Sequence, residues 1–209
     1  MTKLEFLTSL AEKYGTDKNQ HGYLPVYAQY LPDTCRTFIE VGVAKGASAM
    51  MWNDFYGSEE LCIHLVDLFI NPDFVSERWC WNRHFIPHKG SQSDLRFLSK
   101  INAEAEVVSE DGSHNAFDML ITFKHIFINN LASGGVYFME DTHCNRDEFY
   151  WGNGIQSFED TPLWMFKNYL QTGKIENYLF REGEVEVFEN LIKEVHVEAD
   201  EKLIVIIKN

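Results

Sequence analysis

The sequence has few cysteines, no long apolar run and an apolar-poor start. Its four cysteines lie far apart and form no CxxC pair, so neither a zinc site nor a disulfide framework is indicated. No run of about 18 apolar residues occurs, and the first residues hold no apolar stretch of signal-peptide length. We therefore expect a cytoplasmic protein with buried thiols and no membrane-spanning helix.

Basic residues are also scarce, since 18 Lys and Arg stand against 32 Asp and Glu, which gives a net charge of −14. The resulting negative field repels phosphate backbones and anionic lipid headgroups, so neither nucleic acid nor a membrane is expected as a partner. The 209 residues, 45% of them hydrophobic, are enough chain for one sizeable core. A single domain over residues 1–209 is the expectation.

Hydrophobic periodicity predicts an α/β fold. The capping-box spacing of Thr2 and Glu5 predicts a helix that ends at Gly15, as part of an N-terminal helical cap over residues 1–36. Alternating patterns then predict strands and helices. The predicted strands are residues 37–43, 62–69, 84–87, 106–109, 136–139, 194–199 and 203–208, and the predicted helices after the cap are 47–56 and 117–131, the latter before a turn at Gly134 and Gly135. The sheet should be mostly parallel and covered on both faces, and its last two strands should form an antiparallel hairpin.

Residues 142–190 interrupt this alternation with an aromatic-rich, only partly helical insertion that includes Tyr150, Trp151 and Trp164. Two interpretations fit these side chains equally well. They form either a lid over a substrate pocket, or a satellite core or subunit interface. An interface would make the protein a homo-oligomer.

The first predicted strand leads into a loop with Gly42 and Gly46 at the carboxyl end of the strand, where open α/β sheets bind ligands. Glycine lets the backbone approach a ligand closely, and the neighbouring Glu40 disfavours a pyrophosphate but suits a cationic ammonium or sulfonium group. An ordinary strand-to-helix turn is the alternative. Asp67, which ends the second strand, either accepts hydrogen bonds from ribose hydroxyls or caps a helix.

Two acidic pairs, Glu110-Asp111 and Glu140-Asp141, follow neighbouring predicted strands at the same sheet edge. Four carboxylates there repel one another, and the usual remedies are a bound cation or a shared proton. Hard oxygen ligands favour magnesium, manganese or calcium over zinc. We predict Asp111, Glu140 and Asp141 as ligands, whereas Glu110 fits a packed or solvated face.

His114 follows Asp111 by three residues and has a pKa range that suits a general base acting on a hydroxyl held at the metal. A structural histidine is the alternative. His143 also lies beside the acidic cluster, but a supporting or surface position explains it as well.

Five ordered motifs over roughly residues 14–144 resemble the metal-dependent sugar O-methyltransferases of macrolide and related natural-product pathways, which share a Rossmann-like class I methyltransferase fold. The motifs are Tyr14-Gly15-Thr16-Asp17-Lys18 with His21-Gly22-Tyr23 and Tyr27, residues 40–48 with Met51-Trp52, Gly90-Ser91-Gln92-Ser93-Asp94, Asp111-Gly112-Ser113-His114, and Glu140-Asp141. The resemblance implies a seven-stranded, mostly parallel sheet.

The resemblance also implies a reaction. S-adenosylmethionine would be the methyl donor, magnesium or another hard divalent cation would be held by Asp111, Glu140 and Asp141, and His114 would deprotonate the acceptor. The acceptor would be a small molecule with neighbouring hydroxyls, above all a sugar or glycosylated metabolite. The implied cofactor-binding residues are Thr16, Lys18, Tyr23, Glu40, Gly42, Gly46, Ser48, Asp67, Ser91, Gln92 and Asp111.

The sequence departs from the family's pattern in two places. Ala47 stands where the family has its second loop glycine, and little after Cys144 can be matched. A related cephalosporin hydroxylase group has a similar metal and cofactor arrangement. A metal-dependent hydrolase or hydroxylase on the same scaffold therefore stays open, as does a non-catalytic protein that binds through its aromatic segment.

Overall fold

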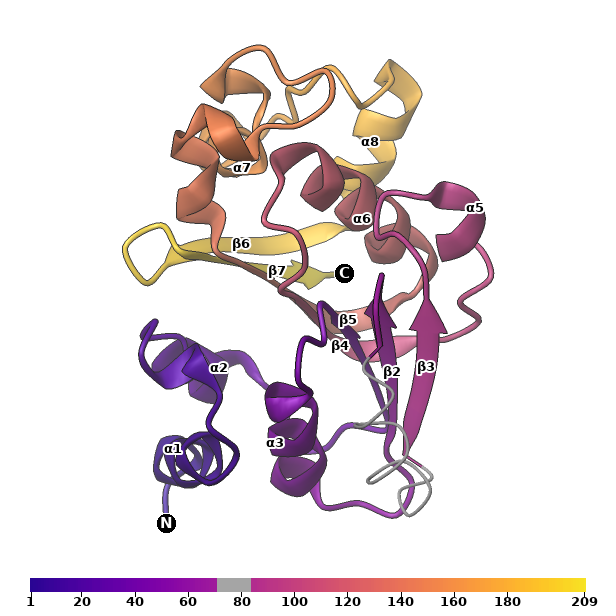
Figure 1. Cartoon of the computed structure of the whole chain (residues 1–209). Helices are drawn as coiled ribbons and strands as arrows, with labels where there is room; N and C mark the ends of the chain where they lie inside the picture. The colour runs from indigo at the N-terminus through magenta and orange to yellow at the C-terminus, as the bar shows by residue number, and fades with distance from the viewer. Residues whose placement is uncertain (71–83) are drawn as a thin grey trace.

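A seven-stranded sheet forms the centre of the computed structural model, which describes residues 1–70 and 84–209 (Figure 1). In spatial order its strands are β3 (Phe85–Lys89), β2 (Cys62–Asp67), β1 (Thr37–Val41), β4 (Ala105–Glu110), β5 (Leu131–Glu140), β7 (Leu203–Lys208) and β6 (Ile192–Glu198). The first five strands are parallel, whereas β7 is antiparallel to both of its neighbours. The predicted mostly parallel sheet with a closing antiparallel hairpin is confirmed.

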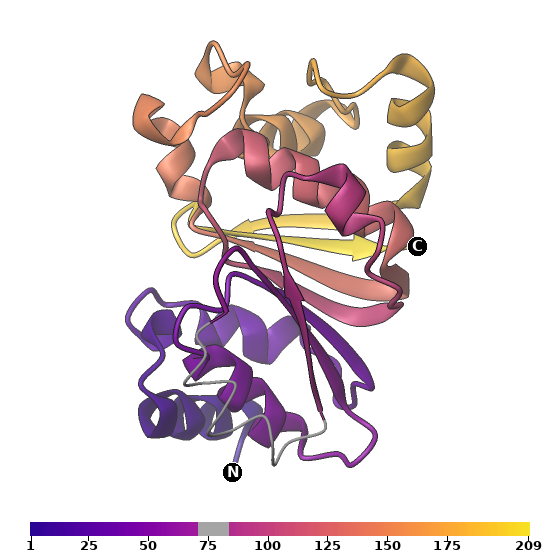
Figure 2. The ribbon, with the colours of Figure 1, turned by 45° about the vertical axis from the view of Figure 1, so that its right-hand side comes forward.

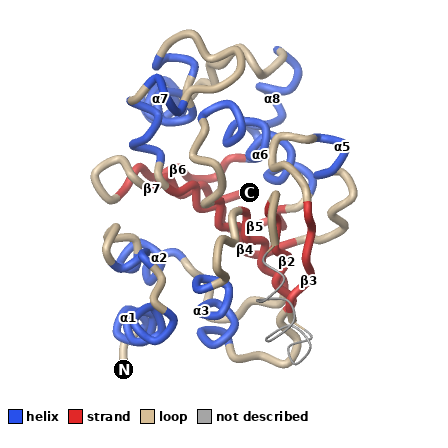
Figure 3. Tube along the Cα trace, in the orientation of Figure 1, coloured by secondary structure: helices blue, strands red, loops and turns tan. Residues whose placement is uncertain are grey.

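Helices cover both faces of this sheet (Figures 2 and 3). The described helices are α1 (Lys3–Tyr14), η1 (Asp17–Asn19), α2 (Leu24–Tyr30), α3 (Ala47–Tyr56), α5 (Leu95–Leu98), α6 (Ala116–Asn129), η3 (Thr142–Arg146), η4 (Glu148–Tyr150), η5 (Phe158–Asp160), α7 (Pro162–Thr172) and α8 (Glu182–Leu191). The first three α-helices lie on one face and α5 to α8 lie on the other.

Strand alternation divides the apolar side chains into two cores. Phe38 and Phe138 pack toward α1, α2 and α3, whereas their neighbours Ile39 and Tyr137 pack toward α6, α7 and α8. Because successive residues of a strand point to opposite faces, every residue near a strand end is assigned to one layer by its position. By the same rule, the side chains of Ser109 and Glu110 point to opposite faces of the sheet.

Helix α1 begins and ends where the sequence predicts. Thr2 and Glu5 form the predicted capping box, and Gly15 ends the helix in the left-handed conformation at φ 70°. Helix α3 spans the predicted residues, and Pro162 opens α7 at its first position.

Strand β5 differs from the prediction. It begins at Leu131 and continues through Gly134 and Gly135, where a turn was predicted. The pairing register between β4 and β5 shifts at this point. Ala105 pairs with Leu131 but Val107 pairs with Val136, so β5 has extra residues, which form a bulge. Glycine is common in such bulges, and local sequence alone does not separate a bulge from a turn.

The aromatic-rich insertion contributes to the core on the α6 face. Phe166 is fully buried there, and Trp151 and Phe158 pack against the same cluster. These contacts account for part of the insertion, and a role as lid or subunit interface stays a prediction.

Two further expectations concern the cysteines and membranes. Cys35, Cys62 and Cys144 are free thiols, whereas Cys80 lies outside the described residues. In residues 1–70 and 84–209, no helix is both long and apolar enough to cross a membrane.

The loops after β1 and β4 touch through their backbones at Gly42. The Asp111 amide donates to the Val41 carbonyl at 2.8 Å, and a Cβ built on Gly42 would lie 1.9 Å from the Asp111 carbonyl oxygen. Gly42 also has φ 86°, a conformation that side chains disfavour. Only glycine therefore allows these two loops to meet.

We expect Gly42→Ala to destabilise the fold more than Gly173→Ala. Both glycines have positive φ, so both substitutions cost roughly 1–2 kcal/mol of backbone strain. A Cβ at Gly173 meets nothing within 4 Å, whereas overlap at Gly42 should add roughly 1–3 kcal/mol or more. Chemical denaturation of the two variants measures the difference, and equal losses of unfolding free energy would contradict the close contact.

A histidine pair links β2 to β3. His64 Nδ1 lies 2.9 Å from His88 Nε2, and the rings stack with centroids 5.1 Å apart. Burial, together with the charge of His88, lowers the pKa of His64 to about 4. Folding therefore holds this imidazole neutral in mildly acidic solution.

This pair should make the fold acid-sensitive. An unfolded histidine titrates near pH 6.5, so between about pH 6.5 and 4 the unfolded chain binds a proton that folded His64 does not. Stability falls as pH falls through this window, by at most about 1.4 kcal/mol per pH unit from this group. His64→Leu removes the contribution of His64 to this pH dependence of stability. The difference in unfolding free energy, variant minus wild type, should be constant above pH 7 and rise from pH 6.5 to 4, and a flat difference would contradict the prediction.

Candidate cofactor and cation site

A cavity of about 150 Å³ lies where the carboxyl ends of β1, β2, β3 and β4 meet. Four of the predicted cofactor-binding residues line it, namely Gly42, Asp67, Ser91 and Gln92, together with Leu68, Gly112 and Ser113. Thr16, Glu40, Gly46 and Ser48 do not line it, and Lys18, Tyr23 and Asp111 belong to the neighbouring carboxylate cluster. The site at this sheet edge therefore has two adjoining parts, the cavity beside the glycine loop and the carboxylate cluster.

Asp67 shapes the glycine loop as well as lining the cavity. Its Oδ2 accepts hydrogen bonds from the amides of Val43 at 2.7 Å and Ala44 at 3.3 Å, and Oδ1 accepts from Phe69 at 2.9 Å. A carboxylate offers about four acceptor positions, so one is left for a ligand. At the other end of the loop, Gly46 caps α3 without a side-chain hydrogen bond, which leaves amides of the first turn free for a ligand.

Glu40 is fully buried at the end of β1 on the α3 side. Its Oε1 accepts a hydrogen bond from Trp52 Nε1 at 3.2 Å, whereas Oε2 has no hydrogen-bond partner. Burial raises the pKa of Glu40 to about 7, against the opposing effect of the Lys18 charge. An unpaired buried carboxylate oxygen is costly, and a cationic ligand group nearby would relieve that cost.

Gln92 holds the loop after β4 in place. Its amide nitrogen donates to Glu110 Oε1 at 2.8 Å, and its oxygen accepts from the Ser113 amide at 2.8 Å. Glu110 points to the α6 face, where burial raises its pKa to about 8. Of the two positions expected for Glu110, a packed face or a solvated face, the structure has the packed one.

The N-terminal cap reaches the carboxylate cluster through three side chains. Lys18 Nζ donates to Asp111 Oδ2 at 2.8 Å and to the two oxygens of Glu140 at 2.7 and 2.8 Å. Tyr27 donates to Glu140 Oε1, and Tyr23 donates to Asp141 Oδ1 at 2.6 Å. Burial alone would lower the pKa of Lys18, but the charges of Asp111 and Glu140 raise it overall. The ammonium therefore stays protonated.

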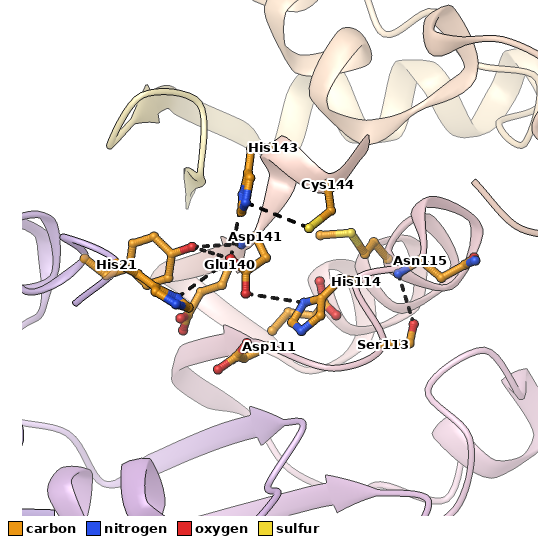
Figure 4. Close-up of polar contacts among 12 residues, drawn as sticks. His21, Asp111, Ser113, His114, Asn115, Glu140, Asp141, His143 and Cys144 are labelled. Carbon is orange, nitrogen blue, oxygen red and sulfur yellow. Dashed lines mark hydrogen bonds and ion pairs between the residues drawn. The ribbon is translucent and has the colours of Figure 1, made fainter. Parts of the chain in front are cut away.

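Asp141 is surrounded by imidazoles (Figure 4). Its oxygens lie 3.6 Å from His114 Nδ1, 3.8 Å from His21 Nδ1 and 3.7 Å from His143 Nδ1. His114 and Asp141 both have left-handed backbone conformations, at φ 55° and 54°. Such strain costs about 1–3 kcal/mol per residue and is concentrated at functional sites.

Asp111, His114 and Asp141 each offer a ligand atom within 4.8 Å of the others. His114 Nδ1 is buried without a hydrogen-bond partner. Three carboxylates, Asp111, Glu140 and Asp141, face one ammonium, so the cluster keeps excess negative charge. Donor type and charge therefore fit a hard divalent cation. Glu140, which was also predicted as a ligand, is turned toward Lys18.

Tyr27, His21 and Ser109 were not among the predicted site residues, although the N-terminal motif of the sequence contains Tyr27 and His21. Ser109 Oγ donates to Glu140 Oε1 at 2.8 Å, and the Tyr27 hydroxyl lies 2.9 Å from the same Ser109 Oγ. Tyr27 follows Tyr23 by four residues, so the helical spacing already places both on one face. No local signal marks Ser109, because its role depends on strand pairing.

The sequence matches no protein-family model and no curated protein. Similar solved structures do exist. MycE methyltransferase from the mycinamycin biosynthetic pathway, in complex with Mg, SAH and mycinamycin VI, is 22% identical with a TM-score of 0.77. The alignment covers 97% of this chain and 54% of MycE, so the chain spans about half the length of that protein.

Two other structures agree at lower similarity. An O-methyltransferase family protein from Burkholderia thailandensis is 13% identical with a TM-score of 0.51, over 94% of this chain and 61% of that one. Aeropyrum pernix fibrillarin with bound S-adenosyl-L-methionine is 16% identical with a TM-score of 0.51, over 86% and 69%. At these identities the likeness shows the fold alone. The chain has the Rossmann-like fold of class I methyltransferases.

Proposed function

We propose that the protein is an S-adenosylmethionine-dependent O-methyltransferase that uses a divalent cation, most simply magnesium, and acts on a hydroxyl of a small molecule. One observation carries the proposal. The cavity beside the glycine loop adjoins the Asp111, Glu140 and Asp141 cluster, because Gly42 packs directly on Asp111. A methyl donor in the first part would therefore face an acceptor held at the second.

The cavity residues suit the cofactor's nucleoside. Asp67 retains an acceptor position for a ribose hydroxyl, and Ser91 and Gln92 line the wall contributed by the loop after β3. Glu40 suits the positively charged methionine end, because its Oε2 is buried and unpaired. The MycE and fibrillarin structures, which contain SAH and S-adenosyl-L-methionine, share this fold and support the assignment.

Asp111, Glu140 and Asp141 are the residues proposed to hold the cation. When bound there, a divalent cation supplies a Lewis acid that stabilises negative charge on the acceptor oxygen. MycE was solved in complex with Mg, which supports a divalent cation in a protein of this fold. A hydroxyl with a neighbouring oxygen makes the best acceptor, so we propose a sugar or glycosylated metabolite.

His114 is proposed to remove the acceptor's proton. Its imidazole lies beside Asp141, and its Nδ1 has no hydrogen-bond partner. With S-adenosylmethionine bound, His114 would take the proton of the acceptor hydroxyl while the acceptor oxygen bonds to the methyl carbon, and the carbon–sulfur bond would break to leave S-adenosylhomocysteine. The strained loops after β4 and β5 would hold His114 and Asp141 in place, so that the acceptor oxygen, the methyl carbon and the sulfur can lie in line.

The first test is calorimetric titration of the metal-stripped protein with S-adenosylmethionine, with and without magnesium. Cofactor should bind in both conditions, and Asp67→Ala should weaken it at least tenfold by removing a ribose acceptor and loosening the glycine loop. Asp118→Ala is the matched control. Asp118 also lines the cavity, but its carboxylate accepts from Ser113 Oγ in the loop after β4 and not from an amide of the glycine loop. No cofactor binding in either condition would sink the proposal and favour a metal-dependent hydrolase.

The second test concerns the base. His114→Ala should lower turnover by about 10²–10⁴-fold, the usual contribution of a general base, with cofactor affinity unchanged. His143→Ala is the matched control, because His143 also lies beside Asp141 but is the more exposed of the two. Turnover is measured as S-adenosylhomocysteine release across a panel of glycosides and catechols. Equal losses in both variants would argue against a special role for His114.

A further inference from the structure

Lys18 is a buried ammonium bound to the predicted cation ligands. Its side chain is 1% exposed, and Nζ lies within hydrogen-bond distance of Asp111 Oδ2 and both oxygens of Glu140. The chain thus supplies its own cation to two of the three carboxylates that a divalent ion would use.

Glu140 is enclosed by these contacts. Lys18, Tyr27 and Ser109 all lie within hydrogen-bond distance of Oε1, and Lys18 also reaches Oε2. The Glu140 side chain is 1% exposed, against 24% for Asp111 and 11% for Asp141. An ion can therefore approach Asp111 and Asp141, but it cannot reach Glu140 while Lys18 stays in place.

The same carboxylates anchor the N-terminal cap. Tyr23 binds Asp141, Tyr27 binds Glu140, and Lys18 binds Asp111 and Glu140, so residues 16–27 contact all three. Docking of residues 16–27 and binding of another cation therefore require the same carboxylate oxygen atoms.

We propose that Lys18 is a resident counter-ion that sets the affinity of the cation site, because a divalent ion gains Glu140 only by displacing the Lys18 ammonium. The inference rests on the proposed function, since it takes these carboxylates as the cation ligands. It makes cation binding and docking of residues 16–27 oppose each other.

The opposition follows from charge. Two like charges cannot share the oxygens of Asp111 and Glu140 at contact distance without strong repulsion in a buried setting. A ligand that must displace an internal competitor binds with an affinity reduced by the population of the competitor-free state. Removal of the ammonium should therefore strengthen divalent binding.

The first experiment is calorimetric titration of the full, metal-stripped chain with Mn²⁺. Lys18→Met should bind Mn²⁺ at least tenfold more tightly than wild type. Lys13→Met is the matched control, because Lys13 is an exposed lysine of the same cap that pairs with Asp54 of α3 and with none of the three carboxylates. Its Mn²⁺ affinity should equal that of wild type.

A second measurement needs no variant, which matters if Lys18→Met fails to fold. Amide hydrogen exchange of the wild type is followed with and without Mn²⁺. Exchange in residues 16–27 should rise when Mn²⁺ binds, whereas a ligand that leaves the cap docked would slow exchange or leave it unchanged.

The outcomes separate the inference from the proposed function. Equal or weaker Mn²⁺ binding by Lys18→Met, or slower or unchanged exchange in residues 16–27 when Mn²⁺ binds, overturns the inference alone. Absence of Mn²⁺ binding to wild type and Lys18→Met alike overturns it together with the cation part of the proposed function.

Discussion

The site depends on a concentration of negative charge that the fold itself creates. Parallel strands bring their carboxyl ends to one edge, and here Asp111 follows β4, Glu140 is the last residue of β5, and Asp141 follows it. Buried carboxylates at contact distance repel strongly unless a cation lies among them. Lys18 meets that requirement for Asp111 and Glu140, and because it belongs to the N-terminal cap, the cap is held at the site by charge as well as by apolar packing.

Strand alternation decides which acidic residues take part. Glu40, Ser109 and Glu140 lie on the face covered by α1 to α3, where Lys18 and Tyr27 can reach them. Glu110 lies one residue after Ser109 and points to the α6 face, where it pairs with Gln92. One step along the strand therefore separates a residue that contacts the carboxylate cluster from a residue that binds Gln92 on the opposite face.

Much of this arrangement could be predicted from local sequence. The capping box of α1, the glycine loop and the acidic pairs lie where residue spacing places them, and the carboxyl ends of the five parallel strands lie within two residues of the predicted ones. The bulge at Gly134 and the contacts of Ser109 could not be predicted, because both depend on which strands become neighbours. Lys18 is the instructive case, since sequence assigned it to the cofactor and the structure places its ammonium on Asp111 and Glu140.

The two parts of the site are coupled through backbone contact as well as charge. Gly42 belongs to the glycine loop, yet it packs so closely on the backbone carbonyl of Asp111, the first residue of the carboxylate cluster, that a Cβ on Gly42 would overlap that carbonyl. A shift of either loop therefore moves the other, and Gln92 transmits the same constraint from the loop after β3 to Ser113. Tyr23 and Tyr27 connect the N-terminal cap to the same unit, because each donates to a carboxylate of the cluster and also lies in the apolar core between the cap and the sheet. Displacement of the cap from these carboxylates would therefore also disturb its apolar packing.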